Sequence, residues 1–323
     1  MSTAKGASRF RFTSGMFEHP LKWRKLGRVL TPRVDLFWNQ THLSLPTVEC
    51  RGGSLIRIYF GGRDHLNRSR IGYADVDLER PEQGEIAADP VLDLGELGTF
   101  DDNGVMPCSL VNDGKDKLLY YVGWNPRATT RFSFYSGLAV SRDGGNRFVR
   151  YSRAPILERT DREPFVNASP MVIRDGPLWR MYYVSGQGWI HPDLPRYNIK
   201  YGESDDGRSW RRDGHACVDF GPPGEHALAR PCVVKDNNVY RMWFAYKGSN
   251  YDLQHNYRIG YAESEDGKNF VRRDGLANID VSSQGWDSEM VTYAFVFRCQ
   301  DRFWMAYNGN NYGRNGLGLA VQE

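Results

Sequence analysis

The sequence lacks any long hydrophobic run. It contains no stretch of about 18 consecutive apolar residues, the minimum for a membrane-spanning helix. The first ten residues carry charges and have no apolar core of the signal-peptide kind. Cysteines are few, odd in number and scattered, with no metal-site spacing: Cys50, Cys108, Cys217, Cys232 and Cys299. We therefore expect a cytoplasmic protein with free thiols, no membrane insertion and no bound metal.

Neither sign of charge predominates. The chain has 42 basic and 39 acidic residues, and the basic residues gather only in short groups such as Arg211 and Arg212. Nucleic-acid binding requires a basic surface, so none is expected. A glycine-rich dinucleotide fingerprint, a phosphate-binding loop and a Gly-x-Ser-x-Gly elbow are also missing from the sequence. We therefore expect no cofactor.

The chain does contain an internal repeat. Residues 258–270 read as a strand, a tight Asp-Gly turn and the start of another strand. The same phrase occurs at 199–210 and, with an extra glycine, at 137–148, and weaker copies begin at Ile71 and Gly316. Five copies of one unit indicate a repeat architecture.

Each repeat contains four short β signals, except that the last one ends after its third strand. Residues 26–30 have the missing pattern, and their pairing with the last repeat would close a ring and remove an open sheet edge. We therefore predict an all-β fold, a five-bladed β-propeller closed by an N-terminal strand that completes the last blade. Residues 21–323 would form this single domain, and residues 1–20 a tail or a lid.

Loop lengths predict which face binds a ligand. The connections between the second and third strands are long and rich in polar and aromatic residues: 61–70, 123–135, 185–198, 246–258 and 308–315. Strand alternation puts them on the same face as the segments that enter each first strand. Function concentrates on long loops held by a rigid scaffold, so this face is predicted to bind.

Carboxylates precede the first strand of several repeats and would converge on the central funnel: Asp101, Asp102, Asp161, Glu163, Glu225, Asp287 and Glu289. Two carboxyl groups flanking a glycosidic bond supply the acid and base of its cleavage, and crowding keeps one of them protonated. The same residues could instead form turns or hydrogen bonds at strand edges. Asp143, Asp206 and Asp266 recur in the turns of the opposite face and are predicted to be structural.

Other candidates on the predicted binding face are cationic or aromatic. Arg63, Arg230 and Arg258 would pair with carboxylates or receive an anionic substrate. Trp124 and Trp286 are predicted to stack on sugar rings, whereas the aromatic residues of the second strands are predicted to be core. His42 could orient a carboxylate, hold an ion or act as a base.

Four segments carry a family resemblance: residues 100–107, 229–231, 257–264 and 285–290. Together with the repeat, they resemble the arabinanase/levansucrase/invertase superfamily of five-bladed propellers, which includes glycoside hydrolase families 43, 32, 68 and 130. They are also similar to bacterial glycosidase-like proteins associated with surface-polysaccharide genes. The resemblance implies an Asp base, a pKa-tuning Asp and a Glu acid on the first three blades. Asp102 matches the tuning Asp, and His42 stands where the Asp base is expected.

The sequence thus predicts a glycoside-active enzyme, an inverting hydrolase acting on a glycan or glycoconjugate at the central funnel. The predicted catalytic carboxylates are Asp102, Glu163 and Glu289. The predicted substrate-binding residues are His42, Arg63, Asp101, Trp124, Arg230, Arg258, Trp286 and Asp287. Two alternatives stay open: a phosphorylase or glycosyl-transferring enzyme of surface-polysaccharide metabolism, and a non-catalytic carbohydrate-binding propeller. The oligomeric state is not predicted.

Overall fold

The structure is a computed structural model that describes residues 21–248 and 256–323. The tail or lid predicted for residues 1–20 lies outside the described residues, as does most of the loop predicted at 246–258. The described chain is nearly all β, with 55% strand and 3% helix, which confirms the predicted all-β class.

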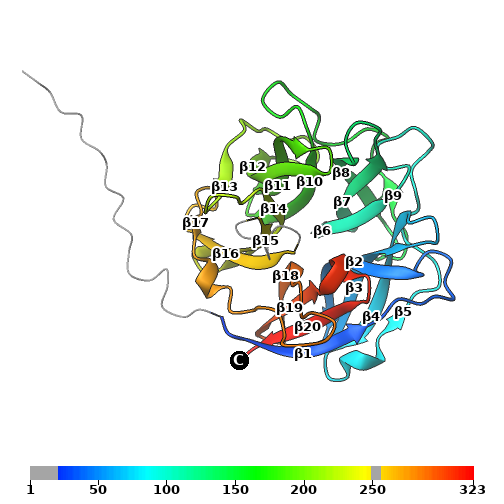
Figure 1. The fold of residues 1–323 in the computed structure, drawn as a ribbon. Helices are drawn as coiled ribbons and strands as arrows, with labels where there is room; N and C mark the ends of the chain where they lie inside the picture. The colour runs from blue at the N-terminus through cyan, green and yellow to red at the C-terminus, as the bar shows by residue number, and fades with distance from the viewer. Residues whose placement is uncertain (1–20, 249–255) are drawn as a thin grey trace, which may run out of the picture.

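The strands form two four-stranded sheets and one twelve-stranded sheet, arranged around a common centre (Figure 1). We describe them below as five groups of four strands, following the sequence repeat. Within each group, neighbouring strands are antiparallel. The first group is β2 (Thr41–Gly52), β3 (Leu55–Arg63), β4 (Ser69–Asp77) and β5 (Glu85–Ile86). The second is β6 (Val105–Asp113), β7 (Asp116–Pro126), β8 (Phe132–Ser141) and β9 (Val149–Arg150). The third is β10 (Asn167–Asp175), β11 (Leu178–His191), β12 (Leu194–Ser204) and β13 (Ala216–Val218).

The fourth group is β14 (Ala227–Asp236), β15 (Val239–Lys247), β16 (Arg258–Ser264) and β17 (Val271–Arg272). The last is β18 (Thr292–Cys299), β19 (Arg302–Asn308), β20 (Leu317–Gln322) and β1 (Trp23–Leu30). Short helical turns in the described residues are η1 (Pro81–Gln83), η3 (Asp274–Leu276) and α1 (Asn310–Gly313). β1 pairs with β20 from Trp23–Gln322 to Leu30–Leu317, so the N-terminal strand supplies the last group's fourth strand.

The first strands of the groups form the inner wall. They contact one another in the order β2, β6, β10, β14, β18 and back to β2. Their neighbours, the second strands, supply much of the core, including fully buried Tyr59, Tyr120, Met242 and Met305. The aromatic second strands therefore lie in the core, as predicted, because both faces of each sheet are covered by neighbouring groups.

The Asp-Gly turns join neighbouring groups. Asp266 accepts hydrogen bonds from Ser264 Oγ (2.8 Å) and from the amides of Lys268 and Asn269 (both 2.8 Å), which holds the turn in shape. The Tyr182 hydroxyl, from the preceding group, donates to the Gly267 carbonyl of this turn at 2.7 Å. Equivalent turns contain Asp143 and Asp206. The predicted structural role of these three aspartates is confirmed.

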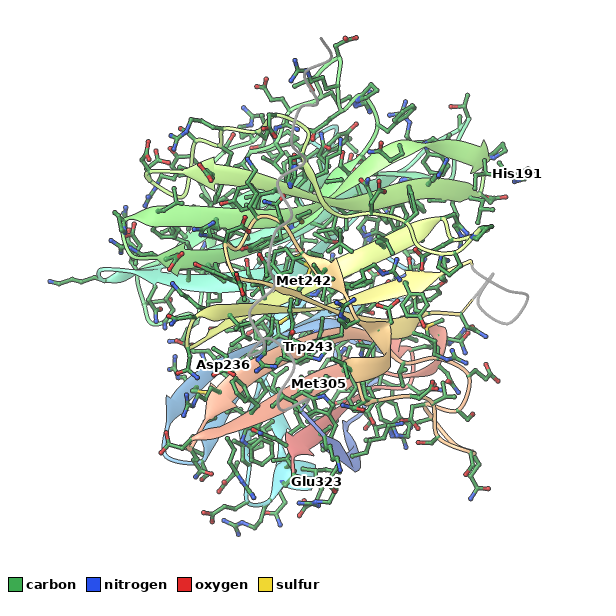
Figure 2. The ribbon with its side chains drawn as sticks, turned by 90° about the vertical axis from the view of Figure 1, so that its left-hand side faces the viewer. His191, Asp236, Met242, Trp243, Met305 and Glu323 are labelled. Atoms are coloured by element: carbon green, nitrogen blue, oxygen red, sulfur yellow. The ribbon has the colours of Figure 1, made fainter. Side chains whose placement is uncertain are left out.

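The two faces differ in the length of their connections. The β11–β12 hairpin extends to His191 at one edge of the molecule, whereas the short β14–β15 turn after Asp236 lies at the opposite edge (Figure 2). The segment predicted as a long loop at 185–198 is thus mostly paired strand with a two-residue turn. The face that bears His191 is the one with the cavity described next.

Candidate binding cavity

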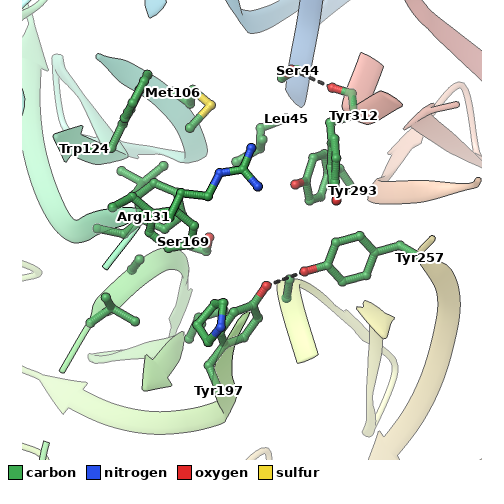
Figure 3. A pocket seen from close by; sticks show the side chains of 18 of the residues that line it. Ser44, Leu45, Met106, Trp124, Arg131, Ser169, Tyr197, Tyr257, Tyr293 and Tyr312 are labelled. Atoms are coloured by element: carbon green, nitrogen blue, oxygen red, sulfur yellow. Dashed lines mark hydrogen bonds between the residues drawn. The ribbon is translucent and has the colours of Figure 1, made fainter. Parts of the chain in front are cut away.

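A cavity of about 320 Å³ opens where the inner strands begin and the long hairpins overhang them (Figure 3). Its lining comes from all five groups and is largely apolar and aromatic, with a few polar side chains. The polar and charged members are Ser44, Arg63, Asn67, Arg131, Ser169, Asp193 and Lys247, together with four tyrosines. Cavities of this composition are the usual form of a small-molecule site.

Irregularities in the inner strands decide which side chains reach the centre. Each inner strand has a register shift near its start, and such bulges re-aim a side chain. At these shifts five non-glycine residues have positive φ: His42, Leu45, Ser169, Arg230 and Tyr293. Leu45, Ser169 and Tyr293 line the cavity. None of the five is a carboxylate, so these residues bring no acidic group to the cavity.

Two hairpins build one wall of the cavity. The Arg131 amide, in the β7–β8 turn, donates to the Pro192 carbonyl of the β11–β12 turn at 2.9 Å. Phe132 lies 4.0 Å from Phe134 and 5.3 Å from Trp189, measured between ring centroids. These contacts fix the hairpins against each other. They hold Arg131, Phe132 and Asp193 at the cavity.

Tyrosines form the opposite wall (Figure 3). The hydroxyls of Tyr197 and Tyr257 hydrogen-bond to each other. The ring centroids of Tyr293 and Tyr312 lie 6.3 Å apart. Burial raises the pKa of Tyr197, Tyr257 and Tyr293 above the ordinary value of 10. These hydroxyls are therefore neutral at physiological pH. They can donate or accept hydrogen bonds to a ligand.

Three cations face the cavity. The Arg131 guanidinium points into its middle (Figure 3). Arg63 Nη1 donates to Asn67 Oδ1 at 2.9 Å, and burial lowers the pKa of Arg63. Lys247 Nζ lies 4.8 Å from the centroid of the Tyr257 ring. Burial, together with the charge of Arg131, lowers the pKa of Lys247 from 10.5 to about 8.

Most of the predicted carboxylates lie elsewhere, in a repeated arrangement that we call the clasp. In each of four groups, one buried carboxylate before the inner strand pairs with a cation on or beside the outermost strand. The pairs are Asp101–Arg150 (2.8 Å), Glu163–Arg212, Glu225–Arg272 (2.6 Å) and Asp287–Lys25 (2.7 Å). In three clasps a second-strand tyrosine also donates to the carboxylate: Tyr121, Tyr183 and Tyr307.

The predicted catalytic residues therefore have unlike surroundings. Glu163 is buried in a clasp and also lies 3.4 Å from Lys200 Nζ. Asp102 accepts hydrogen bonds from the Gly98 amide (2.8 Å) and Asn125 Nδ2 (2.7 Å), which bind it to its own loop and to β7. Glu289 is exposed to solvent. All three lie outside the cavity lining, and their catalytic roles stay predictions.

Of the predicted substrate-binding residues, Arg63 and Trp124 line the cavity. Asp101 and Asp287 are clasp residues, and Trp286 packs on Tyr307 with centroids 5.2 Å apart. Arg230 is fully buried and donates to backbone carbonyls of β2 and β6, including that of Pro46 at 2.8 Å.

The two remaining candidates also lie outside the lining. Arg258 pairs with Asp280 at 3.1 Å and donates to the Glu289 carbonyl. His42 is buried, and its ring nitrogen Nδ1 lies 2.9 Å from Thr41 Oγ1.

Several lining residues were not predicted individually: Arg131, Phe132, Asp193, Tyr197, Lys247, Tyr257, Tyr293 and Tyr312. Six of them fall within the long connections at 123–135, 185–198 and 246–258, so the connections themselves were the available signal. Choosing single residues requires knowing which side of each hairpin faces inward.

Across residues 21–248 and 256–323, no group of three or more His, Cys, Asp or Glu side chains could hold a metal ion. No helical segment of the described chain combines the length and apolar character needed to traverse a bilayer. The five cysteines are free.

Two proteins of Mycobacterium tuberculosis, the uncharacterized proteins MT1551 and Rv1502, are each 41% identical to this chain over 306 residues. The match covers 94% of this chain and all of each relative. No family model matches the chain.

Solved structures share the fold at low identity. A complex of BT0996 with RGII has a TM-score of 0.74 at 18% identity, covering 94% of this chain and 92% of its own. A thermostable family-43 glycoside hydrolase has a TM-score of 0.64 at 15% identity, covering 87% and 88%. The endo-arabinase of Bacteroides thetaiotaomicron also scores 0.64, at 12% identity, covering 91% and 97%. The chain thus belongs to the family of the mycobacterial proteins MT1551 and Rv1502, with the fold of family-43-like glycoside hydrolase propellers.

Proposed function

We propose that this chain is a glycoside-active enzyme that takes a saccharide into the cavity between the hairpins. The observation that carries the proposal is the cavity itself: aromatic walls with a few convergent polar groups, on the face with the long connections of a fold found in glycoside hydrolases. Sugar rings present apolar faces that pack on aromatic side chains and hydroxyls that need hydrogen-bond partners. Trp124, Phe134 and the tyrosine wall offer both.

The proposed reaction is hydrolysis with inversion, which needs two carboxyl groups roughly 6.5–9.5 Å apart. Asp193 is the carboxylate that the described residues contribute to the cavity lining, and it is our first candidate for one of them. Asp102 is our candidate for its partner, because it is hydrogen-bonded to Asn125, the neighbour of Trp124. Glu289 and Glu163 remain the further candidates from the sequence.

A non-catalytic carbohydrate-binding role is the second candidate, and a specific observation favours it. The inner-strand bulges carry no carboxylate, and four carboxylates near the funnel are engaged in clasps. Phosphorolysis or glycosyl transfer in surface-polysaccharide metabolism is the other rival reaction. The cations of the cavity are compatible with it.

The finer points of the architecture belong to the same proposal. We take the five strand groups as the blades of one closed propeller spanning residues 21–323, with residues 1–20 as a tail or a lid. The cycle of contacts among the inner strands and the β1–β20 pairing support a closed ring. A cytoplasmic location is part of the proposal and is supported by the five free thiols.

The test is turnover of aryl glycosides, nucleotide sugars and oligosaccharides, with and without phosphate, followed by mass spectrometry and by NMR of the anomeric proton. We expect release of a sugar of inverted configuration without any phosphate requirement. Asp193→Asn and Asp102→Asn should each lower kcat by at least roughly 10²-fold, with the thermal midpoint nearly unchanged. Product formation that depends on phosphate would replace hydrolysis with phosphorolysis. Saccharide binding without any turnover would leave the non-catalytic role.

A further inference from the structure

The cavity is unbalanced in charge. Among the described residues, Arg63, Arg131 and Lys247 line it, and Asp193, at the exposed hairpin turn, is the one carboxylate in the lining. None of the three cations forms a salt bridge with any residue in 21–248 or 256–323. An uncharged sugar would leave this positive charge uncompensated.

The surroundings of Arg63 and Lys247, which are both partly buried, make the lack of a counter-charge costly, whereas Arg131 is exposed to solvent. Arg63 Nε is buried and has no hydrogen-bond partner within residues 21–248 and 256–323, although the same guanidinium donates from Nη1 to Asn67. Lys247 contacts aromatic faces, with Tyr257 at 4.8 Å and Tyr312 at 5.9 Å from Nζ to the ring centroid. A partly buried cation without a counter-charge destabilises the fold, so its retention suggests a ligand-bound state that offsets the cost.

Most buried cations outside the cavity pair with carboxylates in the described part of the chain, although fully buried Arg230 donates to backbone carbonyls instead. Arg70, also buried on the first group, binds both Asp64 (2.8 Å) and Asp93 (2.6 Å). Arg272 binds Glu225 through two hydrogen bonds, at 2.6 and 3.0 Å. The cavity cations therefore differ from these pairs, because no carboxylate of the described residues binds them.

The geometry also fits the shape of an acidic sugar. Arg131 points into the middle of the cavity, between the Leu45–Met106 side and the tyrosine wall (Figure 3). The hydroxyls of Tyr197 and Tyr257 and the amide of Asn67 lie in the same lining, ready for sugar hydroxyls. Aromatic side chains occupy most of the remaining wall, with Trp124 held by a 2.9 Å hydrogen bond from Nε1 to Ser69 Oγ.

We propose that the saccharide bound here carries an anionic substituent, a carboxylate or a phosphate ester, which is received by Arg131, Lys247 and Arg63. This inference rests on the proposed function and names its substrate class. A planar carboxylate or a phosphate oxygen pair matches the fork of an arginine guanidinium. The ring carrying that anion packs on the aromatic walls, and the same cations select against neutral sugars because those leave the charges unpaired.

The test measures binding of glucuronate, glucose 6-phosphate and glucose to the full chain by calorimetry and saturation-transfer NMR. At least one of the two anions should bind roughly tenfold or more tightly than glucose, since hydrogen bonds between charged groups contribute about that factor. Preference for glucuronate identifies a carboxylated sugar, and preference for glucose 6-phosphate a phosphorylated one. Equal binding of all three probes, or no binding of either anion, would overturn the inference.

Substitutions of the cavity cations test which residues cause the preference for an anionic sugar. Arg131→Gln and Lys247→Gln should each remove most of the preference for the anion, and Lys247→Arg should restore it. The matched control is Arg142→Gln, which removes the same charge from an exposed turn at the far end of β8. Should the cavity variants fold poorly, the wild-type salt dependence decides: anion binding must weaken as salt rises, while glucose binding stays constant. An anion preference that survives both cavity variants would refute the assignment.

The two proposals fail separately. Equal turnover of neutral and acidic glycosides by the wild type and by Arg131→Gln would refute the anionic substrate and leave the glycoside-active enzyme. Absence of both saccharide binding and turnover would refute both.

Discussion

The molecule holds two sets of cations that differ in their partners. The clasp cations Arg150, Arg212, Arg272 and Lys25 each meet a buried carboxylate of their own group. The cavity cations Arg63, Arg131 and Lys247 meet tyrosine rings, an asparagine and open space. The first set stabilises each strand group internally, and the second set is available to a ligand. Charges that a fold leaves unpaired are better guides to function than charges that recur in its repeat.

The largest loss of stability is expected when a clasp ion pair is broken. Glu163→Gln would leave Arg212 and Lys200 beside a neutral amide, with side chains only 10% and 6% exposed. Breaking a buried pair in this way costs about 3–5 kcal/mol of unfolding free energy, which urea unfolding would measure. Glu289→Gln, at an exposed carboxylate, is the control and should cost less than about 0.5 kcal/mol. Similar losses in both variants would remove the distinction between clasp and surface carboxylates.

Near the cavity, buried His42 makes the stability of the fold depend on pH. Burial, Arg63 and Arg314 lower the pKa of His42 from 6.5 to about 3. The unfolded chain then binds a proton below pH 6.5 that the folded chain does not, so stability falls as the pH falls. Between pH 6.5 and 5 this side chain should account for about 1–2 kcal/mol. His42→Asn, which tolerates the positive φ of 64°, should flatten the slope by that amount; an unchanged slope would contradict the account.

The buried ammonium group of Lys247 should change the free energy of unfolding by a similar amount above pH 8. Its pKa is about 8 in the fold and 10.5 in the unfolded chain, and the groups facing it are Arg131, Tyr257 and Tyr312. The unfolded chain therefore binds more protons between these values, so stability rises with pH. From pH 8 to about 9.5, below the ordinary tyrosine pKa, the rise should be about 1–2 kcal/mol. Lys247→Met should lack this rise in urea unfolding, and an identical rise would show that Lys247 is not the buried cation described.

The smallest loss of stability is expected when the tyrosine hydroxyl of a clasp is removed. Tyr183 donates to Glu163 at 2.6 Å, whereas the fourth group has Phe244 at the equivalent place and relies on the Glu225–Arg272 pair. Tyr183→Phe should therefore be tolerated, with a loss of about 1 kcal/mol. Tyr307→Phe, beside Asp287, serves as the parallel case. A loss in the range expected for Glu163→Gln would show that the hydroxyl, rather than the ion pair, holds the clasp.

Local signals were enough to predict much of the fold. The repeated strand phrase and its Asp-Gly turns depend on neighbouring residues, so Asp143, Asp206 and Asp266 could be assigned without coordinates. The strand near Leu26–Leu30 could be matched to the last repeat because a four-strand pattern was one strand short. Pairing of β1 with β20 agrees with that interpretation.

The site was harder to predict because its contacts join distant parts of the chain. Glu163 looked like a catalytic acid from its position before an inner strand, but its partner Arg212 lies far along the chain, in the segment between β12 and β13. The recurrence of Arg150, Arg212 and Arg272 at equivalent places in the repeat could have revealed the clasp. Which hairpin residues face the cavity depends on strand register. The sequence therefore predicted the long connections that contain Arg131 and Lys247, but it could not predict that these two side chains line the cavity.

The most direct test of the central claim is an NMR titration of the Lys247 ammonium group, with and without the acidic sugar that binds best. Without ligand its pKa should lie near 8. A bound anion favours the protonated form, so saturation with the sugar should raise that pKa by about one unit or more. A pKa that stays at its ligand-free value in the saturated protein would contradict the assignment of this cavity to an anionic saccharide.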